Sequence, residues 1–179
     1  MDELKLLNTM SMVFRFRMLS DENDNFVRDY EVLYDTTLLD FHRFILQSLE
    51  YEDCMASFFT ADERWEKLRE FTLMDMGDGT DEAPETMERV TLGQLIHRHR
   101  DRLIYLFDLF GDRAYYLELT GVYEAEPDAV YPREIFARAE APDQYDPSKN
   151  RVEEEESAFD EVMGEFRDFE GDDSYDDEY

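Results

Sequence analysis

Met12-Val-Phe-Arg-Phe-Arg-Met-Leu19 alternates large apolar side chains with arginines along an extended segment. This period of two is typical of a strand that buries one face and exposes the other. Residues 21–25, Asp-Glu-Asn-Asp-Asn, form a polar turn, because such side chains bond to their own backbone. Residues 26–34 then alternate again, so the two segments predict a β-hairpin.

A helix is expected after the hairpin. Thr37 with Asp40 resembles an N-terminal capping pair, and apolar residues then recur at helical spacing to about Leu49. Past Pro127 the spaced prolines predict an irregular chain. Further strands are predicted at residues 55–60, 71–76, 103–109 and 115–123, and a short helix at 91–96. The order ββα-ββ-α-ββ predicts an α+β fold with a mostly antiparallel sheet and helices on one face.

Charge divides the chain into two parts. The whole sequence has a formal net charge of −29, and residues 153–179 alone hold 14 acidic side chains and one basic side chain. Like charges at this density oppose packing into a core. We therefore predict an α+β domain over residues 1–150 and an acidic-aromatic tail over residues 151–179, either disordered or docked as a helix. The candidate binding residues of the tail are its spaced apolar side chains Phe159, Met163, Phe166 and Phe169.

Composition narrows the compartment and the partners. Cys54 is the single cysteine, so no intrachain disulfide forms, as is usual in a reducing compartment. The N-terminus lacks the basic and apolar regions of a signal peptide, and the apolar runs are shorter than the ~20 residues that span a bilayer. We expect a cytoplasmic protein that contacts no membrane. A pI near 4.2 argues against direct nucleic-acid binding, which requires neutralising cations.

No segment carries a catalytic or phosphate-binding motif. His42 falls within the predicted helix and is interpreted as a surface or half-buried histidine. Cys54 follows Glu52 and Asp53, and neighbouring carboxylates disfavour the reactive thiolate. Residues 75–82 are acidic, but the spacing does not match a calcium-binding loop. We predict no catalytic residue, no metal site and no cofactor, and we favour a protein that is not an enzyme.

His97-Arg-His-Arg-Asp-Arg102 is the densest cationic segment. One interpretation is an exposed connection that precedes a strand. The other is a docking patch for the acidic tail of the same or a neighbouring chain. Because exposed ion pairs contribute only about 0–1 kcal/mol each, docking would also require burial of tail aromatics. The patch comprises His97, Arg98, Arg100 and Arg102.

Several segments, in order, resemble the Ri-plasmid open-reading-frame-three-like family, some of whose members lie near transposon passenger genes. Tyr34-Asp-Thr-Thr-Leu-Leu-Asp-Phe-His42 is similar to its helix start, and residues 49–53 with 57–59 to its aromatic-Asp segment. Phe107-Asp-Leu-Phe-Gly-Asp-Arg-Ala-Tyr115 is similar to a later strand entry, and residues 131–142 to the closing motif. The resemblance covers residues 12–146 and implies a compact α+β domain with a hairpin-helix start.

Two pairs of family residues are replaced in this chain. The histidines that follow the aromatic-Asp segment have Met55 and Ser57 as counterparts. The Trp and His of the later motif correspond to Arg113 and Tyr115 in one alignment, or to Ala114 and Tyr116 in another. If the family histidines form a site, the resemblance implies that this chain lacks it.

The favoured function is a non-enzymatic interaction module that presents its acidic tail to a basic protein partner or to its own basic patch. Homo-oligomers are a further expectation. The main alternative is a carboxylate-based, metal-dependent hydrolase, which requires three or more acids or histidines that converge in a pocket. The third alternative is a DNA mimic, in which a rigid face of carboxylates imitates phosphates.

Overall fold

An antiparallel hairpin opens the fold. The computed structural model describes residues 12–75 and 83–149. In it, β1 (Met12–Ser20) pairs with β2 (Val27–Leu33), and Phe16 stands opposite Tyr30. The predicted hairpin is therefore present, and one of its faces, with Phe14, Phe16, Met18, Tyr30 and Val32, belongs to the main core.

A single sheet contains all the described strands, in the order β5-β4-β3-β6-β7-β1-β2-β8. Neighbouring strands run antiparallel, except that β4 and β5 run parallel. The fold is accordingly a sheet-dominated α+β fold. The remaining strands are β3 (Ser57–Ala61), β4 (Lys67–Thr72), β5 (Glu85–Thr86), β6 (Arg102–Asp108), β7 (Arg113–Glu124) and β8 (Arg133–Arg138).

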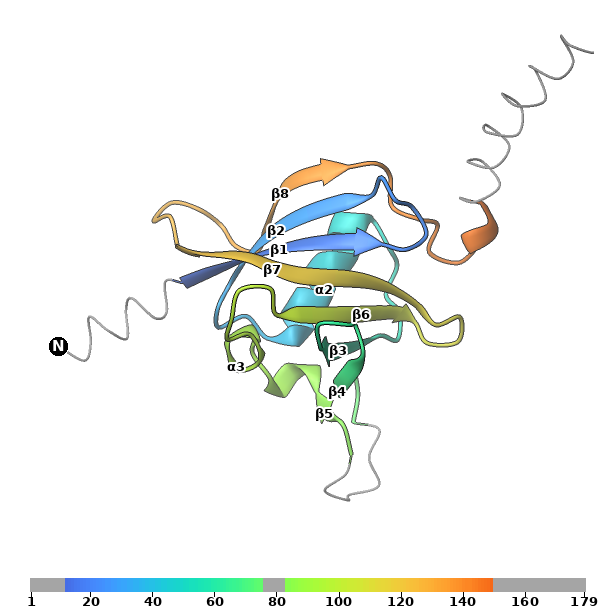
Figure 1. The fold of residues 1–179 in the computed structure, drawn as a ribbon, viewed down its shortest axis with the longest axis horizontal. Coiled ribbons are helices and arrows are strands. Elements are labelled where there is room, and N and C mark those ends of the chain that lie inside the picture. Colours follow the sequence, from blue (N-terminus) through green and yellow to red (C-terminus); the bar gives the residue numbers. More distant parts are fainter. Residues whose placement is uncertain (1–11, 76–82, 150–179) are drawn as a thin grey trace, which may run out of the picture. The chain divides into compact units, whose positions relative to one another are not determined.

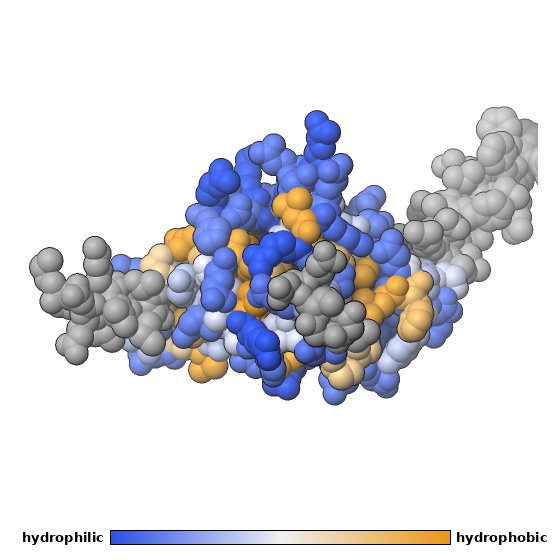
Figure 2. Space-filling view, turned by 90° about the horizontal axis from the view of Figure 1, so that it is seen from below, coloured by the Kyte–Doolittle hydropathy of each residue, from blue (hydrophilic) through white to orange (hydrophobic). Residues whose placement is uncertain are grey.

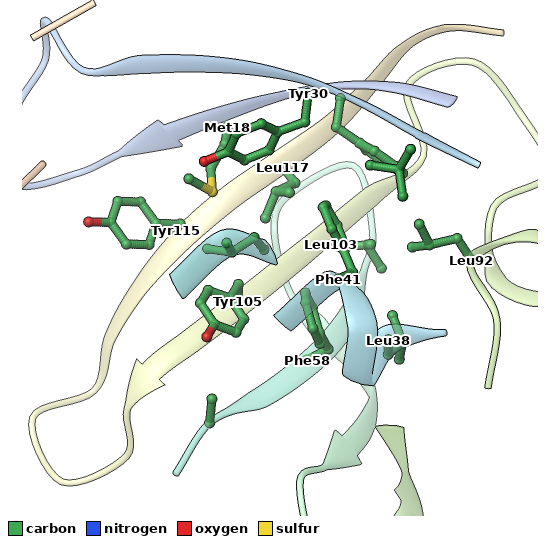
Figure 3. Close-up of a cluster of buried hydrophobic side chains, with 14 of the residues drawn as sticks. Met18, Tyr30, Leu38, Phe41, Phe58, Leu92, Leu103, Tyr105, Tyr115 and Leu117 are labelled. Carbon is green, nitrogen blue, oxygen red and sulfur yellow. The ribbon is translucent and has the colours of Figure 1, made fainter. Parts of the chain in front are cut away.

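Helix α2 (Leu38–Leu49) lies across one face of the sheet, behind the strands in Figure 1. The Thr37 side chain accepts a hydrogen bond from the Asp40 backbone N–H at 3.1 Å, so the predicted N-terminal cap is confirmed. Phe41 of the helix stacks on Phe58 of β3, with ring centroids 5.8 Å apart, inside the core drawn in Figure 3. Two short helices, η1 (Met87–Arg89) and α3 (Leu92–Leu95), follow β5.

The structure corrects three sequence predictions. Residues 133–138 form strand β8, where an irregular chain was expected, because their side chains are mostly exposed and give no alternating apolar signal. Strand β4 spans Lys67–Thr72 and not the predicted residues 71–76, because its first residues are mostly charged and exposed and give no apolar signal. Strand β5 lies between the predicted strand at residues 71–76 and the predicted helix at 91–96, where no strand was expected, and its two residues pair with β4. Strand pairing, and not local pattern, defines these elements.

The outer face of the sheet, away from α2, carries a second small apolar cluster. Ile104, Leu106 and Ala114 are buried there, and Trp65 packs against them. The Trp65 ring meets Tyr116 edge-on, with centroids 5.3 Å apart. This cluster anchors the β3–β4 turn over the strands.

The chain divides into two compact units, Met1–Ala141 and Pro142–Tyr179. Within the described part of the second unit, the Asp143 carboxylate accepts the backbone N–H of Asp146 at 2.8 Å. None of the described helices is long and apolar enough to cross a bilayer. Hydrophilic residues predominate on the face of the protein seen in Figure 2, with apolar patches between them.

Candidate functional site, an arginine-lined groove

Two loops on neighbouring strands enclose an open hollow of about 880 Å³. One loop is the β3–β4 turn, and the other precedes β6. We call this hollow the arginine groove, because arginines from both loops line it. Its lining comprises Ala61, Asp62, Glu63, Arg64, Glu66, Leu68, Arg98, His99, Arg100, Asp101 and Arg102.

The β3–β4 turn is built around the Asp62 carboxylate. Its Oδ1 accepts backbone N–H groups from Arg64 at 2.8 Å and Glu66 at 2.9 Å. The hydrogen bonds from Glu66 and Arg64 lower the pKa of Asp62. Trp65 adopts a left-handed backbone conformation with φ of 63° and packs against the outer cluster. These bonds therefore fix the backbone of Arg64, from which its side chain extends into the groove.

The loop before β6 is organised in the same way, around the carboxylate of Asp101. Its Oδ2 accepts the backbone N–H groups of His97 at 2.8 Å and Arg98 at 2.9 Å. Arg100 has a φ of 72°, and its N–H donates to the Leu119 carbonyl at 3.0 Å. Both aspartates of the groove are thus engaged by the backbone of their own loops.

Arg102 joins the two loops. Its guanidinium donates to Glu118 at 3.2 Å and to the carbonyl of Glu63, and it stacks over the Trp65 ring at 4.4 Å. Such a residue stabilises the groove through cation–π and ionic contacts. Two of its N–H donors are thus used within the protein.

Arg64, Arg98 and Arg100 differ from most cations of the described chain. Elsewhere, lysines and arginines commonly have a carboxylate within 4.0 Å, as for Arg15, Arg17, Arg69 and Arg133. Within residues 12–75 and 83–149, these three groove arginines have no ion-pair partner, and all three are exposed. Glu63 and Glu66 are the exposed acids beside them. Their guanidinium groups can therefore bind carboxylates from another segment.

The structure brings together part of the predicted docking patch. Arg98, Arg100 and Arg102 line the groove, whereas His97 is absent from the lining and contributes a backbone N–H to Asp101. His99 and Arg64 line it as well and were missed. A turn at Asp62-Glu-Arg-Trp65 could have been inferred from the strands predicted on either side, but no sequence pattern connects Arg64 with residue 98. The tail residues Phe159, Met163, Phe166 and Phe169 lie outside the described residues.

His42 is more buried than predicted, at 3% exposure. Its Nδ1 lies 2.6 Å from the Tyr105 hydroxyl, at a core position. Burial lowers the pKa of His42 and raises that of Tyr105. Cys54 is half-buried and packs against the main core.

No group of three or more His, Cys, Asp or Glu side chains that could hold a metal ion occurs in the described part of the chain. The acidic loop weighed as a calcium site lies mostly outside that part, since residues 76–82 are not described.

An open, mostly antiparallel sheet covered by one long helix defines an α+β protein with a surface groove. The family "Plasmid pRiA4b ORF-3-like protein" matches residues 13–150, so the chain belongs to that family, as the sequence motifs indicated. A crystal structure of a protein of unknown function, MM3350 from Methanosarcina mazei Go1, is similar with a TM-score of 0.58. The two share 15% identity over 70% of this chain and 68% of that chain, a likeness of fold. No curated protein matches the chain.

Proposed function

We propose that this chain is a non-enzymatic interaction module that binds acid-rich, aromatic-bearing protein segments in the arginine groove. The observation that carries the proposal is a group of three exposed arginines at one hollow of a chain with net charge −29, none of which has a carboxylate partner among residues 12–75 and 83–149. Arginine suits this role because its planar fork can hold a carboxylate through two hydrogen bonds. The exposed Leu68 at the edge adds apolar surface for an aromatic side chain.

The sequence itself supplies one segment of the required kind. Residues 151–179 combine many carboxylates with Phe159, Met163, Phe166 and Phe169. In this proposal the segment of the same or a neighbouring chain is a ligand of the groove, alongside acidic partner proteins. The setting is cytoplasmic, in keeping with a single cysteine.

A labelled peptide of residues 151–179 tests the proposal by fluorescence polarisation. The receptor is the full chain with Phe159, Met163, Phe166 and Phe169 replaced by serine, so that its own tail competes weakly. We expect Arg98→Ser with Arg100→Ser to weaken binding roughly tenfold, because two exposed ion pairs contribute about 1–2 kcal/mol together. Raising the salt concentration weakens binding as well.

The matched control is Arg43→Ser, an exposed arginine on α2 outside the groove. The receptor with Arg43→Ser is expected to bind the peptide as tightly as the receptor without this substitution. A peptide with the four apolar residues changed to serine binds more weakly than the native peptide. Equal affinity of the groove and control variants would refute the groove as the binding site.

A further inference from the structure

The hairpin turn between β6 and β7 presents an apolar tip to solvent. In Asp108-Leu-Phe-Gly-Asp112, Phe110 is 103% exposed and Leu109 is 40% exposed. The turn lies at the right-hand end of the sheet in Figure 1. Single exposed apolar residues are ordinary on protein surfaces, so the construction of the turn matters more than the exposure alone.

The turn is held in one conformation by its own hydrogen bonds. Asp108 Oδ1 accepts the backbone N–H groups of Phe110 at 3.2 Å and Gly111 at 2.9 Å. A Cβ on Gly111 would approach Asp108 Oδ2 to 2.6 Å, so a larger residue there would displace the Asp108 carboxylate that holds the turn. Asp112 has a φ of 51°, and Lys67 pairs with its Oδ1 at 3.4 Å. The backbone that carries Phe110 is thereby preorganised, so docking of this aromatic residue would order little more than its own side chain.

The carboxylates beside Phe110 indicate the chemistry of its receptor. Asp112 is exposed and its bond to Lys67 uses Oδ1, so its Oδ2 can accept from a cation, whereas Asp108 is half-buried and interacts electrostatically with Arg113 of its own chain. An acid-flanked aromatic fits a hollow that offers apolar surface and arginines. The arginine groove offers both, through Leu68 and the guanidinium groups of Arg64, Arg98 and Arg100.

We infer that the Phe110 tip of one copy docks into the arginine groove of a second copy. The inference rests on the proposed function, in which the groove binds acidic aromatic segments. Full exposure of Phe110 excludes contact with the groove of its own chain in this conformation. The contact joins two different patches, so it is heterologous and either closes into a ring or continues as a chain of copies. At physiological salt the Debye length is about 8 Å, which screens much of the repulsion between acidic copies.

Sedimentation velocity of the full chain over a wide concentration range tests the inference. Wild type is expected to self-associate. Phe110→Ser weakens association by roughly thirtyfold or more, as for loss of an interface hot spot. Arg98→Glu with Arg100→Glu has a similar effect. Val130→Ser, which alters another exposed apolar residue, leaves association unchanged. Because the native tail competes for the groove in the proposed function, the chain with Phe159, Met163, Phe166 and Phe169 replaced by serine is measured as well. The inference is overturned if both this chain and wild type stay monomeric, or if Phe110→Ser and Val130→Ser have equal effects.

A mixing experiment identifies the two surfaces as partners. The Phe110→Ser chain keeps its groove, and the Arg98→Glu/Arg100→Glu chain keeps its tip, so the mixture forms a 1:1 heterodimer although each is monomeric alone. A mixture without heterodimer, beside a wild type that associates, rejects tip–groove pairing. Peptide binding by Phe110→Ser separates the two proposals. If this variant binds the peptide but neither wild type nor the chain with the serine-substituted tail self-associates, the tip–groove inference is wrong and the proposed function stands. If the heterodimer forms but the peptide does not bind, the proposed ligand class is wrong and the tip–groove inference stands.

Discussion

His42 shows at the scale of one residue how burial changes the chemistry of a side chain. The residue sits on α2 but faces the core, and its Nδ1 contacts the Tyr105 hydroxyl. Burial penalises the charged imidazolium, so the pKa of His42 falls below its usual value of 6.5. The hydroxyl partner satisfies one ring nitrogen of the neutral histidine. His42 is thus a satisfied core residue in this fold.

The lowered pKa makes stability depend on pH. Below pH 6.5 the unfolded chain binds a proton at His42 more readily than the folded chain does. The contribution of neutral, buried His42 to the free energy of unfolding is therefore fully present above pH 6.5 and is lost as the pH falls toward the folded pKa. The slope from this single site is at most about 1.4 kcal/mol per pH unit. Urea unfolding of wild type and His42→Asn from pH 7.5 to 5 should show a shallower slope for the variant, by roughly this limit at most.

Tyr105→Phe provides the comparison, because it removes the hydroxyl and keeps His42 buried. Its pH slope should match that of wild type even if its stability is lower, since burial is the largest cause of the pKa shift. A His42→Asn chain with the full wild-type slope would contradict this explanation.

At the scale of elements, the N-terminus of α2 is where separate segments meet. The Leu38 N–H donates to the Val90 carbonyl at 2.9 Å, and the Gly93 N–H donates to the Tyr34 carbonyl at 2.9 Å. A Cβ on Gly93 would lie 2.1 Å from the Tyr34 ring, so only glycine permits this approach of α3. The cap at Thr37 therefore supports both the helix and the segment docked on it.

Thr37→Ala should destabilise the protein by about 1 kcal/mol, within a range of roughly 0.5–2, because the Asp40 N–H loses its acceptor. Thr37→Ser keeps the hydroxyl and should remain close to wild type. Chemical denaturation of the three chains measures the difference. Identical losses for alanine and serine would show that the methyl group, and not the cap, stabilises this position.

At the scale of the whole molecule, the sheet order joins the two ends of the described domain. The N-terminal strand β1 lies between β2 and β7, and the last strand β8 closes the edge beside β2. Arg133 of β8 bonds to the buried Glu31 at 2.7 Å, and Arg15 of β1 bonds to the same carboxylate at 2.9 Å. Although burial opposes it, these arginines lower the pKa of Glu31. The C-terminal strand is thus part of the cooperative structure.

Truncation tests this cooperativity. A chain that ends at Glu126 lacks β8 and leaves Glu31 with one arginine, whereas a chain that ends at Ala141 keeps both. The shorter chain should melt at a lower temperature than the longer one, because it loses the pairing of β8 with β2 and one of the two arginines that bond to Glu31. Circular dichroism measures both midpoints. Equal midpoints would show that β8 adds nothing to the folding unit.

The elements with strong local signals were predictable from the sequence. The alternation of residues 12–19 indicates β1, and the apolar stripe after Thr37 indicates α2, because side-chain period reports which face is buried. Strand β8 could not be predicted in this way, since most of its side chains are exposed and it forms only by pairing with β2. The start of β4 was missed for the same reason.

The residues alone therefore specify an α+β chain with a hairpin-helix start, an acidic excess and one dense basic segment, all of which are local or additive properties. Tertiary structure decided which cations remain available. Arg102 contacts Glu118 and Trp65 of its own chain. Arg64 and Arg98 line the same groove because β3 pairs with β6. Tertiary structure also buried His42 and exposed Phe110. Such outcomes depend on contacts between residues far apart in sequence, and no local pattern carries them.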